Sequence, residues 1–250
     1  MYAMLTNDDG IASPGLQALR DEGLRRGHRI LICAPKEQQS AASQRITLGR
    51  PLFVHQTEDS PSVQAWAIDG TPSDCVRVGV ELADGKPDFC ISGINNGENA
   101  GSAVYYSGTV AAAREAAMHH IPAFAASLIA QGATDEMRRA LAKKVFDLAE
   151  NARLDRFPRY GVVNVNAPAI PSEDWGEITL CPLASAYYLD SYERRVSPHG
   201  QVYYWLKTGL PMEEPEPGSD YDLLRRGFVT CTVLADMGNA NALADDILML

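Results

Sequence analysis

The sequence predicts an α/β fold, a doubly wound and mostly parallel sheet followed by a smaller β-rich region. Two observations support this prediction. From residue 2 to residue 165, short apolar runs alternate with stretches of helical periodicity, which is the order of elements in a parallel sheet with helices on its faces. After about Pro168, proline, glycine and aromatic residues become more frequent and the strand-like runs are short. We therefore expect a core over residues 1–168 and a β-rich region over 169–250, whose last segment returns to the core.

The first half of the chain shows both kinds of element clearly. Ser13 precedes Pro14 and a helical run, so Ser13 is the expected N-cap and Pro14 the first helical residue. Thr71 and Pro72 repeat this helix start, and Asp74 adds a capping box. Strands are expected over Tyr2 to Thr6, Arg29 to Ala34, Gln64 to Ile68 and Asp88 to Ser92.

The second half continues the alternation as far as residue 165. An alanine-rich helix is expected over Val110 to His119, and a longer helix with a charged outer face over Asp135 to Ala152. Strands are expected over Pro122 to Leu128 and Gly161 to Val165. The alternation again indicates parallel strands joined through helices.

The overall composition is that of a globular, acidic protein. The chain has 250 residues, 46% of them hydrophobic, and a formal net charge of −10. It contains no run of Lys or Arg that could follow a phosphodiester backbone, so polymeric nucleic acid is not an expected partner. Five scattered cysteines without C-x-x-C spacing are expected to be buried, reduced thiols of a cytoplasmic protein. No basic start followed by an apolar signal core appears and no apolar stretch approaches about 18 residues, so neither secretion nor a membrane span is expected.

Two adjacent carboxylates, Asp8 and Asp9, follow the first expected strand directly. Asp-Gly is a common turn pair, and Asp9-Gly10 fits that interpretation. A turn needs only one Asp, however, and the second adds like-charge repulsion unless a positive charge lies between the two. A bound cation is therefore the alternative to a simple turn.

Further oxygen ligands follow two later strands. Ser40 lies in the loop after the second strand, and Asn95 and Asn96 lie in an expected loop, Ser92 to Gly97, after the fourth. In an open parallel sheet, ligands bind outside the carboxyl ends of the strands. Two carboxylates, a hydroxyl and an amide oxygen favour a hard divalent cation, Mg²⁺ or Mn²⁺, over zinc. Taken singly, Ser40 and the Asn pair are also typical loop residues.

A candidate phosphate site precedes the alanine-rich helix. The segment Tyr106 to Val110 places the hydroxyls of Ser107 and Thr109 where a helix start exposes backbone N–H groups, which suits a phosphate. Plain N-capping by Ser107 or Thr109 is the alternative. The sequence contains no P-loop motif, no glycine-rich dinucleotide motif and no D-x-D after the first strand.

Taken in order, these motifs resemble the SurE family, the stationary-phase survival proteins. The resemblance is strong over about residues 1–128 and weaker beyond. It rests on Asn7 to Ile11 with Pro14-Gly15, Ala34-Pro35 to Ser40 with Ser43 and Thr47, Gly70 to Val76, Ser92 to Asn95, and Tyr106 to Val110 with Ala113 to Glu115. Weaker landmarks are Asn164 to Asn166, Tyr203 to Trp205 and Gly218 to Asp222.

The resemblance implies a Rossmann-like core, an oligomer, and a metal-dependent phosphatase, a 5′/3′-nucleotidase that acts on nucleoside monophosphates. It implies one divalent ion per subunit, Mg²⁺ or Mn²⁺, on Asp8, Asp9, Ser40 and Asn95. It places the substrate phosphate near Asn96, Ser107, Gly108 and Thr109. The sequence departs from the family pattern at Ser13, Ser73 and Glu98, and Glu98 bears on substrate preference more than on the chemistry.

Two mechanisms and two classes of function stay open at this point. Asp8 or Asp9 either orients an attacking water beside the cation or forms a phospho-aspartyl intermediate. A non-catalytic module, receiver-like or nucleotide-sensing, also places paired acids after the first strand and binds Mg²⁺. Such a receiver needs an acceptor Asp at the end of a later strand, whereas the strand at 88–92 ends in Ser-Gly-Ile-Asn.

Other polar residues near these motifs are expected to have structural roles. His119 and His120 end the alanine-rich helix, where a cation suits the helix dipole. Arg114 and Glu115 are expected to form structural pairs, with Arg114 as an alternative support for the phosphate site.

Aromatic residues are concentrated between residues 187 and 205. Five of the ten tyrosines and one tryptophan lie there: Tyr187, Tyr188, Tyr192, Tyr203, Tyr204 and Trp205. With a turn at Ser197 to Gly200 and a Pro- and Glu-rich return at 211–218, we expect a projecting hairpin that buries its aromatics on a second subunit, in a homodimer or homotetramer. The alternative is a hairpin folded back on its own sheet.

Overall fold

A computed structural model describes residues 1–185, 191–207 and 214–235. Its strands are β1 (Tyr2–Thr6), β2 (Arg29–Pro35), β3 (Val54–Asp59), β4 (Val63–Ile68), β5 (Phe89–Asn96), β6 (Ala123–Leu128), β7 (Val162–Ala167), β8 (Thr179–Leu180), β9 (Ser191–Val196), β10 (Val202–Lys207) and β11 (Thr230–Leu234). Its α-helices are α1 (Pro14–Arg25), α2 (Pro72–Leu82), α3 (Gly108–Met118), α4 (Asp135–Asn151) and α5 (Asp220–Arg225). Short 3-10 helices lie at Gly101–Tyr105, Leu154–Arg156 and Ser172–Asp174.

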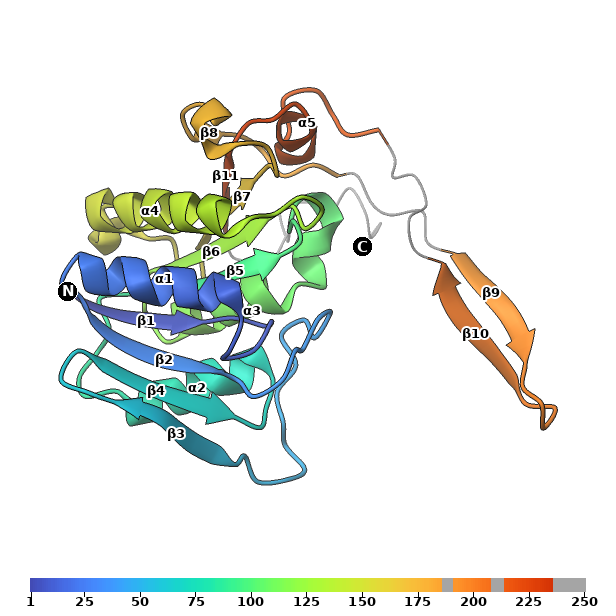
Figure 1. The fold of residues 1–250 in the computed structure, drawn as a ribbon, viewed down its shortest axis with the longest axis horizontal. Coiled ribbons are helices and arrows are strands. Elements are labelled where there is room, and N and C mark those ends of the chain that lie inside the picture. The colour runs from blue at the N-terminus through green and yellow to red at the C-terminus, as the bar shows by residue number, and fades with distance from the viewer. Residues whose placement is uncertain (186–190, 208–213, 236–250) are drawn as a thin grey trace, which may run out of the picture.

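One nine-stranded sheet, with the order β3-β4-β2-β1-β5-β6-β7-β11-β8, organises the molecule. The strands from β4 to β7 pair in parallel, whereas β3 and β11 lie antiparallel to β4 and β7. Helices α1 and α4 cover one face of the sheet, and α2 and α3 pack together on the other (Figure 1). The predicted doubly wound, mostly parallel α/β fold is confirmed.

A separate apolar core lies on each face of the sheet. Leu5 of β1 packs in the cluster that includes Phe146 of α4, and its neighbour Met4 packs in the cluster that includes Val76 of α2. Because successive strand residues point to opposite faces, a strand covered on both faces is apolar at every position. This explains why the central strands are continuous apolar runs in the sequence.

The predicted elements between residues 2 and 165 are present, with three differences. The edge strand β3 was not predicted, because its residues Val54–Asp59 are mostly polar and exposed. A loop was expected over residues 92–97, but strand β5 extends to Asn96. After an irregularity between Ser92 and Asn95, it resumes its pairing with β6. Helix α3 begins at Gly108 rather than Val110, because its N-cap is Ser107.

The predicted helix caps are confirmed. The Ser13 side chain accepts a hydrogen bond from the N–H of Leu16 at the start of α1, with Pro14 as the first helical residue. Thr71 and Asp74 form a reciprocal capping box at the start of α2. Such local contacts can be predicted from sequence because both partners lie within one turn of the helix.

The chain after Pro168 returns to the main sheet. Strand β11 pairs antiparallel with β7, and the two-residue strand β8 pairs with β11 on its outer side. Helix α5 packs against β11. The division of the chain into two regions near residue 168 stays a prediction.

Strands β9 and β10 form the predicted hairpin. Their antiparallel register ends at Val196 and Val202, beside a turn in which the N–H of Ser197 donates to the carbonyl oxygen of Gln201 at 2.8 Å. Every residue of β10 is exposed, and the hairpin lies apart from the sheet (Figure 1). It is therefore not folded back on its own sheet. Tyr187, Tyr188 and residues 211–213 of the expected arm lie outside the described residues.

All five cysteines are buried and free, as predicted. Burial raises the pKa of the Cys90 thiol to about 12 and that of Cys231 to about 11, so these thiols are unreactive at neutral pH. Within the described residues, no helix has the length and apolar character needed to cross a membrane.

Gly15, in the first turn of α1, lies against the end of β5. A Cβ added at Gly15 would overlap the carbonyl oxygen of Ile94 and lie 2.8 Å from its carbonyl carbon, and both are backbone atoms. Only glycine permits this approach. The contact therefore sets the distance between α1 and the strand segment that carries Asn95.

Gly15→Ala is expected to lower the free energy of unfolding by about 1–3 kcal/mol or more. The β5 backbone cannot move aside without disturbing its pairing with β1 and β6. Urea denaturation measures the change, with Gly176→Ala as the control, because no atom lies within 4 Å of a Cβ added there. Equal losses in the two variants would contradict the close approach.

Candidate active site

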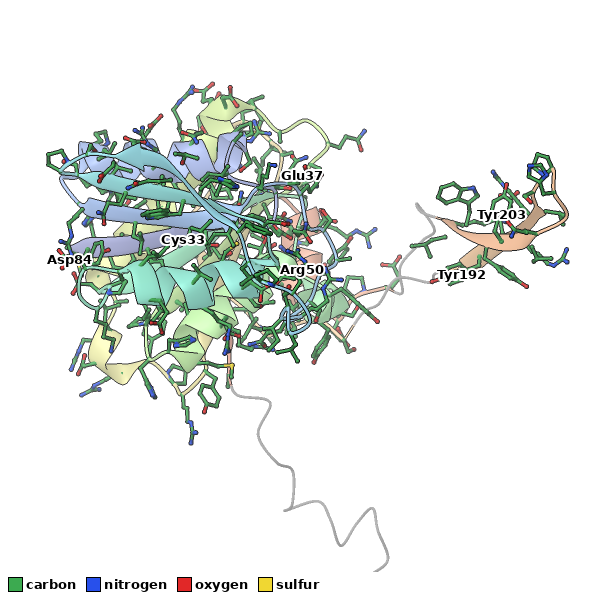
Figure 2. All side chains as sticks on the ribbon, turned by 90° about the horizontal axis from the view of Figure 1, so that it is seen from below. Cys33, Glu37, Arg50, Asp84, Tyr192 and Tyr203 are labelled. Atoms are coloured by element: carbon green, nitrogen blue, oxygen red, sulfur yellow. The ribbon has the colours of Figure 1, made fainter. Side chains whose placement is uncertain are left out.

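Three polar segments meet at the carboxyl edge of the sheet. Strand β1 pairs in parallel with β2 on one side and with β5 on the other, so residues 7–10 and 36–40, which follow β1 and β2, lie next to the end of β5 at Asn95 and Asn96. Figure 2 shows Glu37 at this end of the molecule and Asp84 at the opposite end. The structure places Asp8, Asp9, Ser40 and Asn95 at this one edge of the sheet.

Asn7 forms the turn that carries the two adjacent carboxylates. Its Oδ1 accepts a hydrogen bond from the N–H of Gly10 at 3.2 Å, and its Nδ2 donates to the Gly10 oxygen at 2.9 Å and to Oγ of Ser13 at 2.7 Å. Gly10 has a φ of 98°, in the left-handed region that favours glycine. The turn is thus closed by Asn7, and neither Asp8 nor Asp9 is needed to make it.

Asp8 is held against the start of α3. Its side chain is 4% exposed, and Oδ1 accepts a hydrogen bond from the Thr109 hydroxyl. A Cβ at Gly108 would lie 2.8 Å from Cβ of Asp8, so glycine is needed for this approach. Burial raises the pKa of Asp8 to about 6; the Thr109 hydrogen bond opposes the rise and the charge of Asp9 adds to it.

Both carboxylate oxygens of Asp9 accept a hydrogen bond. Oδ1 accepts a hydrogen bond from Nε2 of Gln38 at 3.2 Å, and Oδ2 accepts one from the N–H of Asn96 at 2.9 Å. The same Nε2 donates to Oγ of Ser40 at 2.9 Å. One nitrogen therefore lies within hydrogen-bond distance of both Asp9 and Ser40, which places these two candidate ligands close together.

Asn95 contributes an amide to the same edge. Its Nδ2 donates to the carbonyl oxygen of Gly97 at 2.7 Å, which leaves the amide oxygen as the atom available to a cation. Among the residues that the structure describes, no three His, Cys, Asp or Glu side chains form a metal cluster. The set at this edge instead combines two carboxylates with hydroxyl and amide oxygens. Such an all-oxygen set fits Mg²⁺ or Mn²⁺.

The residues expected near the phosphate make different hydrogen bonds in the structure. Ser107 is the N-cap of α3, where its Oγ accepts a hydrogen bond from the N–H of Val110 at 3.0 Å. Thr109 is fully buried and donates its hydroxyl hydrogen bond to Asp8. Ser107 therefore caps α3, and Thr109 supports a carboxylate. Asn96 has its backbone N–H on Asp9 and is exposed.

A buried amide network anchors the loop between β5 and α3 at Asn99. The N–H of Asn99 donates to Oδ1 of Asn166 at 2.7 Å, and Nδ2 donates to Oγ of Ser127 at 2.8 Å. Nδ2 of Asn164 donates to the Asn99 oxygen at 2.8 Å. All four residues are buried. Strands β6 and β7 therefore hold the loop that joins Asn95 to the start of α3.

Asp220 anchors the same loop from the C-terminal part of the chain. Its carboxylate is fully buried and accepts hydrogen bonds from the N–H groups of Gly101 at 3.1 Å and Ala184 at 2.8 Å. Burial raises its pKa, and these backbone hydrogen bonds oppose the rise. Sequence reasoning quoted Asp220 only as a weak landmark, because Gly101 is 119 residues away in the chain.

The loop that carries Ser40 is hydrogen-bonded to α2 and to the 3-10 helix Gly101–Tyr105 that precedes α3. Oγ of Ser43 donates to the Tyr105 oxygen at 2.9 Å, and Oγ1 of Thr47 donates to Oδ2 of Asp74 at 2.6 Å. Burial opposes ionisation of Asp74, but the hydrogen bonds from Thr47 and Thr71 hold its pKa below the usual value. Asp74 therefore caps α2 and also fixes this loop.

The remaining polar candidates lie apart from the carboxylate pair. Glu115 is ion-paired with Arg77 at 3.0 Å, as the structural expectation requires, and His119 lies 3.6 Å from it. Arg114 forms no ion pair with any residue that the structure describes, so its expected pair is not found there, and its buried Nε has no hydrogen-bond partner among the same residues. Arg114 lines a different cavity, beside Cys181.

Two cavities flank the loop after β2. One, of about 440 Å³, is lined by Asp9, Lys36, Asn96 and Arg138 among others. The other, of about 420 Å³, is lined by residues that include Lys36, Gln39, Phe53 and His55. Lys36 lies in the wall of both. The first cavity gives a small molecule access to Asp9.

Comparisons with known proteins agree with this geometry. The family model described as Survival protein SurE matches residues 3–190. The chain is 39% identical over 241 residues to the 5′-nucleotidase SurE of Desulfatibacillum aliphaticivorans, which covers 95% of this chain and 93% of that protein. It is 38% identical over 238 residues to the 5′-nucleotidase SurE of Desulfovibrio desulfuricans, with 94% and 92% covered. The crystal structure of the SurE protein from Aquifex aeolicus superposes with a TM-score of 0.80 at 32% identity, covering 99% of this chain and 98% of that chain. The chain belongs to the SurE family.

Proposed function

We propose that this protein is a divalent-metal-dependent phosphomonoesterase that hydrolyses nucleoside 5′-monophosphates, and 3′-monophosphates, to nucleoside and phosphate. The observation that carries the proposal is the meeting of Asp8, Asp9, Ser40 and Asn95 at one sheet edge, beside the start of α3. Relatives named 5′-nucleotidase SurE match more than nine-tenths of the chain, which supports the same reaction.

Asp8, Asp9, Ser40 and Asn95 hold one Mg²⁺ or Mn²⁺ in this proposal. A divalent ion bound there neutralises charge on the phosphoryl group and lowers the pKa of a bound water. Burial and, to a smaller extent, the charge of Asp9 raise the pKa of Asp8, and a cation between the two carboxylates would favour their charged forms. The single Gln38 nitrogen that reaches Asp9 and Ser40 supports a shared cation at these two residues.

The chain's own residues divide the remaining work. Asp9 is the more exposed acid, and both its oxygens are held in place, so it orients the attacking water. Asn96, Ser107 and the backbone at Gly108 hold phosphate oxygens at a helix start, where fixed donors contribute most as charge shifts in the transition state. Thr109 acts through Asp8.

Phosphate release from a panel of nucleoside monophosphates, with Mg²⁺ or Mn²⁺ and with EDTA, tests the proposal. Metal-dependent release without a burst is the expected result. Saturable nucleotide binding without release would instead indicate a sensing module. The receiver-like alternative is not favoured, because the chain belongs to the SurE family and β5 ends in Asn95 and Asn96.

The protein is also proposed to assemble with itself through the β9–β10 hairpin. Tyr192, Tyr204 and Trp205 are 64%, 60% and 58% exposed, and the hairpin carries its tyrosines away from the body of the molecule (Figure 2). Because adjacent strand residues point to opposite faces, Tyr204 and Trp205 give the hairpin two aromatic faces. An isolated two-stranded hairpin is marginally stable in water, so a second subunit is the proposed partner, in a dimer or tetramer.

A cytoplasmic location completes the proposal. All five cysteines are free and buried, without a disulfide among them. Unbridged thiols are typical of proteins that work in a reducing compartment.

Asp8→Asn and Asp9→Asn are each expected to stay folded and to lose most Mn²⁺ binding, because each removes a ligand charge from a hard-cation site. Removing one of two repelling carboxylates is also expected to raise the melting temperature of the metal-free protein. Calorimetric titration with Mn²⁺ and thermal melts in EDTA measure both effects. Asp59→Asn, at the exposed end of β3, is the charge-matched control. If either site variant binds Mn²⁺ like the wild type, the metal assignment is wrong.

Ser107→Ala and Thr134→Ala remove equivalent N-caps, from α3 and α4. Each is expected to lower the free energy of unfolding by about 0.5–2 kcal/mol. Only Ser107→Ala is expected to lower turnover while Mn²⁺ affinity is retained, because only Ser107 borders the phosphate site. Denaturation and steady-state kinetics separate the two effects, and equal kinetics in both variants would mean that Ser107 is a helix cap alone.

The double variant Tyr204→Ser/Trp205→Ser is expected to form a smaller assembly than the wild type, because it removes an apolar side chain from each face of the hairpin. Sedimentation velocity measures the assembly. Leu180→Ser, at a position 73% exposed on β8, is the control. A wild-type protein that sediments as a monomer, or a double variant whose assembly has the wild-type mass, would contradict the assembly proposal.

A further inference from the structure

The cavity next to Phe53 adjoins the candidate active site but has no part in the chemistry above. Its volume is about 420 Å³, within the usual range for small-molecule pockets. The N–H of Gln39, a residue of its wall, donates to the carbonyl oxygen of Asp8 at 2.7 Å. One wall of the cavity is therefore bonded directly to the backbone of a candidate metal ligand.

Phe53 presents an aromatic ring to this cavity. It directly precedes β3 and is 60% exposed, while its carbonyl oxygen accepts a hydrogen bond from the N–H of Asp69 at 2.9 Å. The backbone is therefore held while most of the ring stays accessible. His55, two residues further on, also lines the cavity, as expected for residues on the same side of a strand. A single exposed Phe is ordinary, but here the ring forms part of a concave wall beside a reaction site.

The second cavity has a different chemistry. Its described lining includes Asp9, Lys36, Asn96 and Arg138 and no aromatic side chain. It suits a phosphate and water rather than a planar base. Lys36 lies in the wall of both cavities, with its N–H bonded to the Ile68 oxygen at 2.9 Å. A nucleotide that spans the two cavities would pass this cation between its base and its phosphate.

We propose that the cavity at Phe53 binds the nucleobase of the substrate, with the base stacked on the Phe53 ring and the phosphate directed past Lys36 to the carboxylate pair. This inference rests on the proposed nucleotidase function. Stacking on an aromatic ring tolerates every base, because every base has a π-face. Phe53 then determines specificity for nucleotides over sugar phosphates rather than for one base over another.

The test compares AMP with ribose 5-phosphate, which carries the same phosphate ester and no base. Phe53→Ala is expected to lower kcat/KM for AMP by about 5- to 150-fold, chiefly through KM, and to leave ribose 5-phosphate unchanged. Phe53→Tyr retains the ring and is expected to restore the AMP value. Phe228→Ala removes a partly exposed aromatic residue outside both cavities and is the control.

Arg138→Ala is the converse variant, because Arg138 lines only the second of the two cavities. Its effect on kcat/KM is expected to include ribose 5-phosphate as well as AMP. A loss confined to AMP in Arg138→Ala, equal losses for both substrates in Phe53→Ala, or no loss in Phe53→Ala would each overturn the assignment. The nucleotidase proposal itself fails if the wild type releases phosphate from neither substrate.

Adenosine binding to the metal-free protein, measured by saturation-transfer NMR, separates the base-site proposal from the nucleotidase proposal because it needs no turnover. Loss of adenosine binding in Phe53→Ala and its return in Phe53→Tyr support the base site even without hydrolysis. Binding to Phe53→Ala at the wild-type level overturns it.

Discussion

The parallel pairing of β1 with β2 and β5 is the constraint on which the candidate site depends. These three strands are buried on both faces, so their register is set by the two apolar cores rather than by their polar ends. All three strands therefore end at the same edge of the sheet, and the polar residues at their ends lie next to one another. Groups that repel each other are thereby held together by packing energy from elsewhere in the sheet. This is the usual reason why sites in such folds lie at the carboxyl edge.

The second consequence is a carboxylate with little access to water. Gly108 lets α3 approach so closely that Asp8 is 4% exposed, and burial raises its pKa to about 6. Burying a charge is costly unless it is paired or bonded. Thr109 supplies one hydrogen bond, and the start of α3 supplies a favourable dipole. A nearby positive charge would stabilise the buried carboxylate further, and a divalent ion bound to the same carboxylates would supply it.

The C-terminal part of the chain supports the site without entering it. Asp220 holds Gly101, and the amides of Asn164 and Asn166 hold Asn99, so the loop after β5 is fixed from strands and helices on the far side of β6. A buried polar network of this kind makes a loop rigid because each broken hydrogen bond leaves an unsatisfied group. The projecting hairpin belongs to the same region, which therefore serves both the geometry of one site and the proposed contact between subunits.

The sequence by itself determined the features whose causes are local or periodic. Continuous apolar runs predicted the buried strands, the Ser13-Pro14 and Thr71-Pro72 pairs predicted two helix starts, and position after a strand marked Asp8, Asp9, Ser40 and Asn95 as candidates. Strand β3 was missed because an exposed edge strand needs no apolar run, and Asn96 was placed in a loop because β5 continues only through its pairing with β6. The tertiary structure alone decided that Thr109 serves Asp8 from 101 residues away, that Asp220 reaches Gly101, and that Phe53 faces a cavity beside the site. Most of these contacts join residues far apart in the chain, and their partners are set by how the strands and helices pack, which no local pattern records.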